Sequence, residues 1–459
     1  MISSKHINKI VAVAVVFALS MSVMIVYAAD AYESSYIPEY QKRLFNGNVV
    51  TIDIQADNDD WKRLNDNASD KEWIAADLSI NGEVFSGVGI RTKGNSSITK
   101  TEKSESDKYS LNIELNKYVK GQTFYGLDTF CLNNMVGDAT YMKEYIAYDI
   151  MSYIGVATPL TNYAIVTVNG EYYGFMLILE RYEESFLDRV NGTTSGQLYN
   201  VKKEKGDNGG SLLYYGSNKN RYSQIFDNVV FKNKSDKHEE RIITAIENLN
   251  AGTNLEQYWD VDRILRYFAA HTAVVNLKSY ISDQQQNYYL YIREGKVTIL
   301  PWSYHLAFGG YPKIETDATF FVNFPIDTPV YGVGMEDRPL LDKLLAVPEY
   351  KERYHDYLSQ IVEGYFNSGL FEETIYDLSS SIGGYVQNDS SGFYSYEQFT
   401  ESLANLIKFG LLRAESITGQ LNGNIPSTTR GQSIDSAALI DASSVDLSSM
   451  GGLHSDADS

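Results

Sequence analysis

One segment of the chain, residues 261–310, constrains the fold more than any other. A helix is predicted over residues 261–275, because apolar side chains recur there at helical spacing. Two apolar strands follow, joined by a turn at residues 293–296, with a polar loop on each side of the pair. If the strands pair as an antiparallel hairpin, both loops meet at the same open end. The segment therefore predicts that the loop containing Lys278 and the loop that begins at Ser303 share one site.

This order of helix, polar loop, hairpin and glycine-containing loop matches the catalytic half of a protein kinase. In kinases the first loop supplies a catalytic Asp and a metal-binding Asn. The loop after the hairpin supplies a second metal-binding Asp. The pattern therefore indicates where the catalytic groups of a kinase would stand in this chain.

The residues before this segment favour strands. Asn-Gly pairs at residues 81–82 and 169–170 each separate two strand-like runs and predict tight hairpins. Residues 49–54 and 109–115 alternate apolar and polar side chains, as half-buried strands do. A helix is predicted over residues 141–154. We therefore expect an α+β protein with a strand-rich N-terminal part and a larger helical C-terminal part.

The first 28 residues have the features of a secretory signal peptide. Two lysines precede an apolar run over residues 10–26, and Val26 and Ala28 suit a cleavage site. The alternative is an uncleaved anchor, since the run approaches the length that spans a bilayer. We expect a protein that is secreted or held in the cell envelope or spore coat, with no membrane segment after cleavage.

Three parts are expected after the signal peptide. Residues 29–180 form the strand-rich part, which contains a polar loop at residues 91–97, and residues 181–420 form the mostly helical, catalytic-type part. Residues 421–459 are rich in Ser, Gly and Asp and predict a disordered tail. Residues 191–236 are rich in Gly, Asn, Lys and Ser, which favours an insertion or flexible surface loop.

Composition excludes several classes of function. The formal net charge of −20 disfavours binding to nucleic acid or to anionic lipid. The single cysteine, Cys131, excludes an intramolecular disulfide and a Cys-based zinc site. An exported chain without disulfides indicates a bacterial protein rather than a eukaryotic one. No phosphate-binding Walker motif is present, and the six histidines are scattered singly.

Several stretches between residues 49 and 365 resemble one known family in the same order. They are GVGIRTKGNSS (87–97), YGLD (125–128), DATYMKEY (138–145), VNGEYYG (168–174), EESF (183–186), LPW (300–302), NFPIDTP (323–329) and EDRP (336–339). The chain resembles the CotH family of spore-coat-type atypical protein kinases. This resemblance implies a secreted or envelope protein with an atypical protein-kinase-like fold. It also implies ATP and Mg²⁺ as cofactors and phosphorylation of Ser or Thr on a protein substrate.

The sequence departs from the family at the positions that carry the chemistry. Lys278 stands where the family usually has the Asp that accepts the substrate proton. Ser303 replaces the Asp that would hold Mg²⁺, and His305 replaces an Asn. Asn112 stands where a phosphate-binding lysine is common, whereas Asn287 is retained. Lys278 and Ser303 are thus the substituted catalytic positions, and Asn287 and Ser303 are the remaining, weak metal ligands.

The resemblance implies nucleotide contacts from Arg91, Lys93, Asn95 and Asn112. From the residues alone, residues 91–97 fit either a phosphate-facing loop or a solvated hairpin loop. Asn287 fits either a metal or phosphate contact or the start of a strand. Glu144, in the predicted helix, fits either the ion-pair partner that a kinase helix supplies or a surface carboxylate.

The substitutions point to a pseudokinase or a much weakened kinase. A protonated lysine cannot act as a general base, and losing such a base costs on the order of 10²–10⁴ in rate. A serine hydroxyl is a weak ligand for Mg²⁺ beside a carboxylate. The expected function is binding of a protein partner at the cell surface or coat, with ATP as a further ligand. The alternatives are an active atypical Ser/Thr kinase acting on coat or surface proteins, and an adhesin or cell-wall binding module on the same fold.

Overall fold

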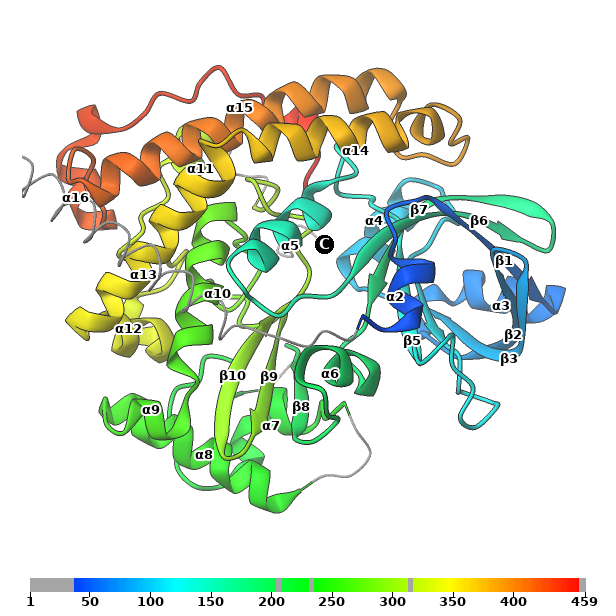
Figure 1. The fold of residues 1–459 in the computed structure, drawn as a ribbon, viewed down its shortest axis with the longest axis horizontal. Coiled ribbons are helices and arrows are strands. Elements are labelled where there is room, and N and C mark those ends of the chain that lie inside the picture. Colours follow the sequence, from blue (N-terminus) through cyan, green and yellow to red (C-terminus); the bar gives the residue numbers. More distant parts are fainter. Residues whose placement is uncertain (1–36, 204–207, 231–234, 313–316, 454–459) are drawn as a thin grey trace, which may run out of the picture.

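The computed structural model describes residues 37–203, 208–230, 235–312 and 317–453. The predicted signal peptide lies outside the described residues. The fold is α+β, with a β-barrel beside a larger body of helices that encloses a second sheet (Figure 1). Within the described residues, no helix is both long enough and apolar enough to cross a bilayer.

Seven strands close into a barrel in the order β1-β2-β3-β4-β5-β7-β6. Their bounds are β1 Val50–Ala56, β2 Ile74–Ile80, β3 Glu83–Thr92, β4 Leu111–Glu114, β5 Thr129–Asn133, β6 Thr161–Val168 and β7 Glu171–Glu180. Both Asn-Gly hairpins are confirmed, since Ile80 pairs with Glu83 and Val168 with Glu171. Parallel pairing of β1 with β6 closes the barrel around an apolar core.

The second sheet has three antiparallel strands in the order β10-β9-β8, with bounds β8 Gln197–Val201, β9 Tyr288–Arg293 and β10 Lys296–Pro301. The predicted hairpin is confirmed by β9 and β10. The flexible loop predicted over residues 191–236 is wrong for β8, which pairs along β9. Leu198, Tyr199 and Val201 are buried there, and this short apolar stretch was hidden by the polar residues around it.

Helices make up most of the remaining structure. Up to residue 251 they are α2 Glu39–Leu44, α3 Asn58–Asp66, α4 Ser96–Lys103, α5 Lys143–Tyr153, α6 Glu184–Asn191, α7 Ser223–Phe226 and α8 Asp236–Ala251. Further along are α9 Leu255–Tyr258, α10 Val261–Val274, α11 Ala318–Val322, α12 Pro339–Leu345, α13 Pro348–Ile361, α14 Leu370–Gln387, α15 Tyr396–Leu421 and α16 Thr429–Ile434.

Helix α10 is the predicted helix that precedes the candidate site. The side chain of Asp260 accepts a hydrogen bond from the Arg263 amide and caps its first turn. Most of its residues are buried, because α5, α13 and strand β10 pack around it. A helix held on several sides fixes the position of the loop that follows it. Above this layer, α14 and α15 run side by side across the top of the molecule (Figure 1).

The disordered tail predicted from residue 421 is wrong for the described residues up to 453. Ala442, Met450 and Leu453 are buried in this part of the chain. The side chain of Asn323 bonds both backbone groups of Ile440. Single apolar residues that dock one by one on a helical surface produce no periodic pattern, and the Ser- and Asp-rich composition hid them.

Candidate functional site

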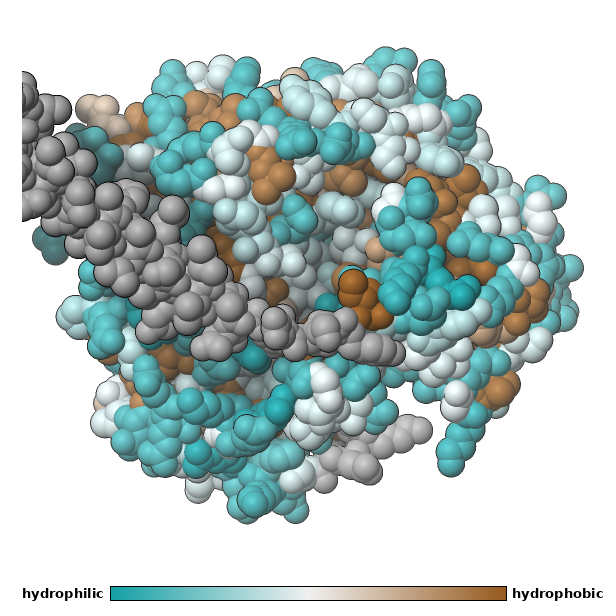
Figure 2. Space-filling model, in the orientation of Figure 1, coloured by the Kyte–Doolittle hydropathy of each residue, from teal (hydrophilic) through white to brown (hydrophobic). Residues whose placement is uncertain are grey.

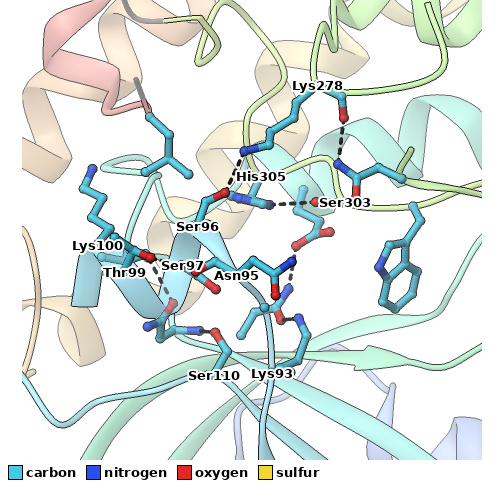
Figure 3. Close-up of a pocket in the computed structure, with 18 of the residues that line it drawn as sticks. Lys93, Asn95, Ser96, Ser97, Thr99, Lys100, Ser110, Lys278, Ser303 and His305 are labelled. Atoms are coloured by element: carbon cyan, nitrogen blue, oxygen red, sulfur yellow. Dashed lines mark hydrogen bonds between the residues drawn. The ribbon is translucent and has the colours of Figure 1, made fainter. Parts of the chain in front are cut away.

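A cavity of about 1090 Å³ lies between the barrel and the helical part. Its wall is built from the end of β3, the first turns of α4, the chain before α5, the two loops that flank the β9–β10 hairpin, and Gly452 and Leu453 (Figure 3). Segments far apart in the sequence therefore contribute to one site. The face drawn in Figure 2 is largely hydrophilic, with small and separate hydrophobic patches.

Lys278 and Ser303 both line this cavity. The register of the hairpin pairs Tyr288 with Pro301, so the two flanking loops lie at the same end. The amide of Asn287 donates to the backbone oxygen of Lys278 at 2.7 Å. The amide of Asn276 donates to the backbone oxygen of Ser303 at 3.0 Å. The convergence predicted from the hairpin is thus present in the structure.

Ser303 occupies a constrained position. Its φ is +66°, which is uncommon for a residue other than glycine. Its amide donates to the hydroxyl of Tyr148 at 3.2 Å, and its Oγ lies 3.3 Å from Nδ1 of His305. Burial, together with the nearby charges of Lys93 and Lys278, lowers the pKa of His305 to about 3. His305 is therefore neutral at pH 7, and the Ser303–His305 pair brings no negative charge to the cavity.

Glu144 is buried and held by hydrogen bonds, so the surface-carboxylate alternative is wrong. Its carboxylate accepts from the amide of Asn133 at 2.7 Å and from the backbone of Tyr304 at 3.1 Å. Lys93 donates in turn to the carbonyl oxygen of the Asn133 side chain. Burial raises the pKa of Glu144, and the charge of Lys93 opposes that rise. Lys93 and Glu144 are thus coupled through Asn133 rather than in direct contact.

The other expected nucleotide contacts also line the cavity. The guanidinium of Arg91 lies 4.4 Å from the ring centre of Trp73. Asn95 accepts a hydrogen bond from Lys71 through its side-chain oxygen. Asn112 pairs with Arg91 across β3 and β4, and its side-chain oxygen accepts from the thiol of Cys131 at 3.1 Å. All four residues expected from the family, Lys93 included, are on one wall.

Sequence reasoning missed several residues of this wall. Helix α4 begins at Ser96, where a polar loop was expected, and brings Ser96 and Lys100 to the cavity. Asn133 and Arg181 arrive at the ends of barrel strands. The Asn at position 95 before a polar helical stretch is a helix-start signal that could have identified α4.

Positive charge dominates the cavity. Among the described residues that line it, nine are basic: Lys71, Arg91, Lys93, Lys100, Lys103, Arg181, Lys202, Lys203 and Lys278. Only Asp138 and Glu144 are acidic. This excess stands against a chain whose formal net charge is −20. Clustered cations in a partly enclosed site concentrate anions, so the arrangement suits a ligand with several negative charges.

The donor set does not fit Mg²⁺, which prefers carboxylate and phosphate oxygens. Both cavity carboxylates are already engaged, since Asp138 accepts from Thr140 and from the Lys143 amide, and Glu144 is held as described. Asn287 uses its amide to hold the Lys278 backbone. Across the described parts of the chain, no three His, Cys, Asp or Glu residues cluster in a way that could hold a metal ion.

Comparison with known proteins agrees with the resemblance drawn from the motifs. The model of the family described as CotH kinase protein matches residues 90–417. A similar protein is the inner spore coat protein H of Bacillus subtilis (strain 168). It is 22% identical over 293 residues, which cover 61% of this chain and 75% of that protein.

Proposed function

Because this chain belongs to the CotH kinase protein family, we propose that it is an exported pseudokinase that binds a phosphate-bearing anion such as ATP without efficient transfer. The observation that supports this is the shared position of Lys278 and Ser303. They stand at the two acidic positions expected from the family, and both line one strongly basic cavity. The atypical kinase fold is part of this proposal.

The chemistry of the two positions argues against turnover. Phosphoryl transfer depends on positioning and on neutralising charge around the metal and phosphates. The ammonium of Lys278 has no lone pair with which to accept a proton from a substrate hydroxyl. The hydroxyl of Ser303 carries no charge and is turned toward His305. Loss of a general base alone costs on the order of 10²–10⁴ in rate.

The same substitutions favour binding without a metal. A kinase places Mg²⁺ against the phosphates to offset their charge. In this cavity, Lys93, Lys278 and Lys100 approach from β3, the loop after α10, and α4 (Figure 3). Lysine binds phosphate as a point charge. We therefore expect these side chains to replace much of the metal's charge, and we expect the affinity to fall as salt rises.

The place of action follows from the predicted signal peptide and from the named relative. The relative is called an inner spore coat protein. We propose that this chain is exported and acts at the cell surface or in a coat, where it contacts a protein partner. An anion bound in the cavity would contact both the barrel and the helical part. It would thereby fix their relative position, which we propose the protein partner recognises.

A matched pair of proteins tests the proposal. The wild type and the Lys278→Asp/Ser303→Asp variant are assayed for Mg²⁺-dependent transfer of labelled phosphate from ATP. We expect transfer only in the variant, because it regains both carboxylates. We also expect ATP in EDTA to raise the melting temperature of the wild type. Equal, strong transfer by both proteins would overturn the proposal in favour of an active kinase, and no stabilisation by ATP would overturn its binding part.

A further inference from the structure

Two adjoining hollows lie along α14, and neither shares a lining residue with the basic cavity. The larger, about 540 Å³, lies between α14 and α5. The smaller, about 320 Å³, lies between α14 and strands β6 and β7. Ser381 lines both, so the two hollows adjoin along the helix, and together they are called the groove below. Figure 1 shows α14 passing above α5 toward the barrel.

A ladder of four stacked aromatic rings connects the two hollows. Tyr385, which lines the smaller hollow, stacks on Phe175 with ring centres 5.7 Å apart. Phe175 stacks on Tyr163 at 5.3 Å, and Tyr163 on Tyr145 at 6.1 Å. Tyr145 lines the larger hollow. The interplanar angles are 6°, 8° and 10°. The two end rings of the stack therefore lie in the two hollows, Tyr385 in the smaller and Tyr145 in the larger.

The ladder is rigid where it is buried and open at the groove. Tyr163 and Phe175 are in the core, so the outer rings rest on a fixed base. Tyr385 is 38% exposed, and Tyr153, in the larger hollow, is 46% exposed. Aromatic faces held in place before binding lose little entropy when a ligand packs on them.

The polar lining of the groove carries negative charge. Asp149 and Asp377 line the larger hollow, and Asn388 lines the smaller. Tyr365 donates its hydroxyl to Asp149 and fixes that carboxylate. Among the described residues of the two hollows, none is Lys, Arg or His. This is the reverse of the basic cavity, so the groove repels phosphate and suits a neutral or positively charged ligand.

We propose that this groove binds an oligosaccharide that contains amino sugars. One face of a pyranose ring is made of C–H groups and packs on the face of an aromatic ring. The remaining hydroxyls suit the Ser, Asn and Asp side chains of the groove. A sugar ammonium is attracted both by the carboxylates and by the tyrosine faces. Rigid tyrosines together with two acids are the observation that carries this assignment.

The probe is the glucosamine hexamer, titrated calorimetrically into the full chain, with the N-acetylglucosamine hexamer and hexalysine as comparisons. We expect the glucosamine hexamer to bind and the acetylated hexamer to bind several-fold more weakly. Tyr385→Ala should weaken binding about tenfold, the value of one stacked ring. Tyr385→Phe keeps the ring and should retain binding. Tyr376→Ala is the matched control, because this tyrosine of α14 is 58% exposed and lines neither hollow.

Four results would overturn the inference. If neither sugar hexamer binds, the proposed sugar site is wrong. If hexalysine binds more tightly than the glucosamine hexamer, the groove binds a basic peptide instead. Equal binding of both sugars removes the assignment to amino sugars. Unchanged affinity in Tyr385→Ala and in Tyr153→Ala removes the location. Each variant is also tested for stabilisation by ATP, which should be unchanged, so that failure here is distinguished from failure of the proposed nucleotide site.

Discussion

The ammonium of Lys278 donates a hydrogen bond to the hydroxyl of Ser96, with 2.7 Å between Nζ and Oγ (Figure 3). The contact joins the loop after α10 to the first turn of α4 and so crosses the cavity from the helical part to the barrel side. Lys278 is buried, and its Nζ lies 5.2 Å from the ring centre of Tyr311. The position at which the family resemblance predicts a carboxylate thus brings a lysine to the cavity.

Lys278→Ala should weaken the binding of ATP in EDTA by about 10- to 100-fold, because a charged hydrogen bond contributes about 1.5–3 kcal/mol. The loss should shrink as the salt concentration rises, since salt screens the attraction between Lys278 and the phosphates in the wild type. Isothermal titration at two salt concentrations measures both effects. Lys62→Ala is the control, since Lys62 is an exposed lysine that pairs with Asp66 on α3 and does not line the cavity. An equal loss in both variants would show that net charge, not position, sets affinity.

The convergence of Lys278 and Ser303 was predictable because it needs only local pairing. The two apolar runs and the turn between them predict the β9–β10 hairpin, and the hairpin in turn determines which two loops lie at its open end. The Asn-Gly hairpins of the barrel are local in the same sense. The closure of the barrel was not predictable this way, because β1 pairs in parallel with β6 across more than a hundred residues.

The link from Lys93 through Asn133 to Glu144 was also beyond sequence patterns. Its three side chains come from the end of β3, the end of β5 and helix α5, and only the assembled barrel brings them together. Each residue alone has several ordinary roles on a surface. The buried residues of the C-terminal segment, such as Met450 and Leu453, were not predicted for a related reason. Isolated apolar residues form no periodic pattern in the sequence.

Removing one partner of the buried ion pair between Lys108 and Asp389 should strongly destabilise the fold. The nitrogen and oxygen lie 2.6 Å apart, and the side chains are 2% and 0% exposed. Burial lowers the pKa of Lys108, and the nearby carboxylate of Asp389 opposes this. Asp389→Ala leaves an unpaired buried cation and should cost about 3–5 kcal/mol in urea unfolding. The Lys108→Met/Asp389→Ala double variant should lose less than the single variant, and a larger loss would contradict this account.

Protonation of Asp327 should make the free energy of unfolding fall at acidic pH. Burial alone would raise the pKa of Asp327, but hydrogen bonds from His355, Lys351 and Ser427 outweigh burial and lower it to about 2. A carboxyl with a lowered pKa stabilises the fold above its unfolded value of about 3.9. That contribution is lost as the pH falls through the folded pKa.

Asp327→Asn should therefore cost about 1–2 kcal/mol at pH 7, after allowance for solvent screening. Its effect should fade between about pH 4 and pH 2. Urea unfolding at a series of pH values measures both. Asp356→Asn serves as the control, because Asp356 is an exposed carboxyl on α13, next to His355 in the sequence. A cost for Asp327→Asn that does not change with pH would show that its packing, not its charge, matters.

Gly451 should hold the C-terminal segment, residues 450–453, in place beside the basic cavity. Its φ is +77°, and a Cβ there would lie 2.8 Å from the Tyr394 hydroxyl, 2.9 Å from the Gly137 oxygen and 3.0 Å from the Ala139 nitrogen. Two residues away, Leu453 lines the cavity and donates its amide to the Gly310 oxygen at 3.0 Å. Because two of these three obstacles are backbone atoms, a shift of the Tyr394 side chain alone cannot make room, and Gly451→Ala has to move the segment.

We expect Gly451→Ala to speed limited proteolysis of the C-terminal segment and to lower the melting temperature. Gly384→Ala is the matched control, because Gly384 is helical and a Cβ there meets nothing within 4 Å. That substitution should stabilise α14 by up to about 1 kcal/mol. If the segment helps to shape the cavity wall, Gly451→Ala should also reduce stabilisation by ATP, whereas Gly384→Ala should not. Equal protease resistance in both variants would show that residues near 451 are not held by the contacts described.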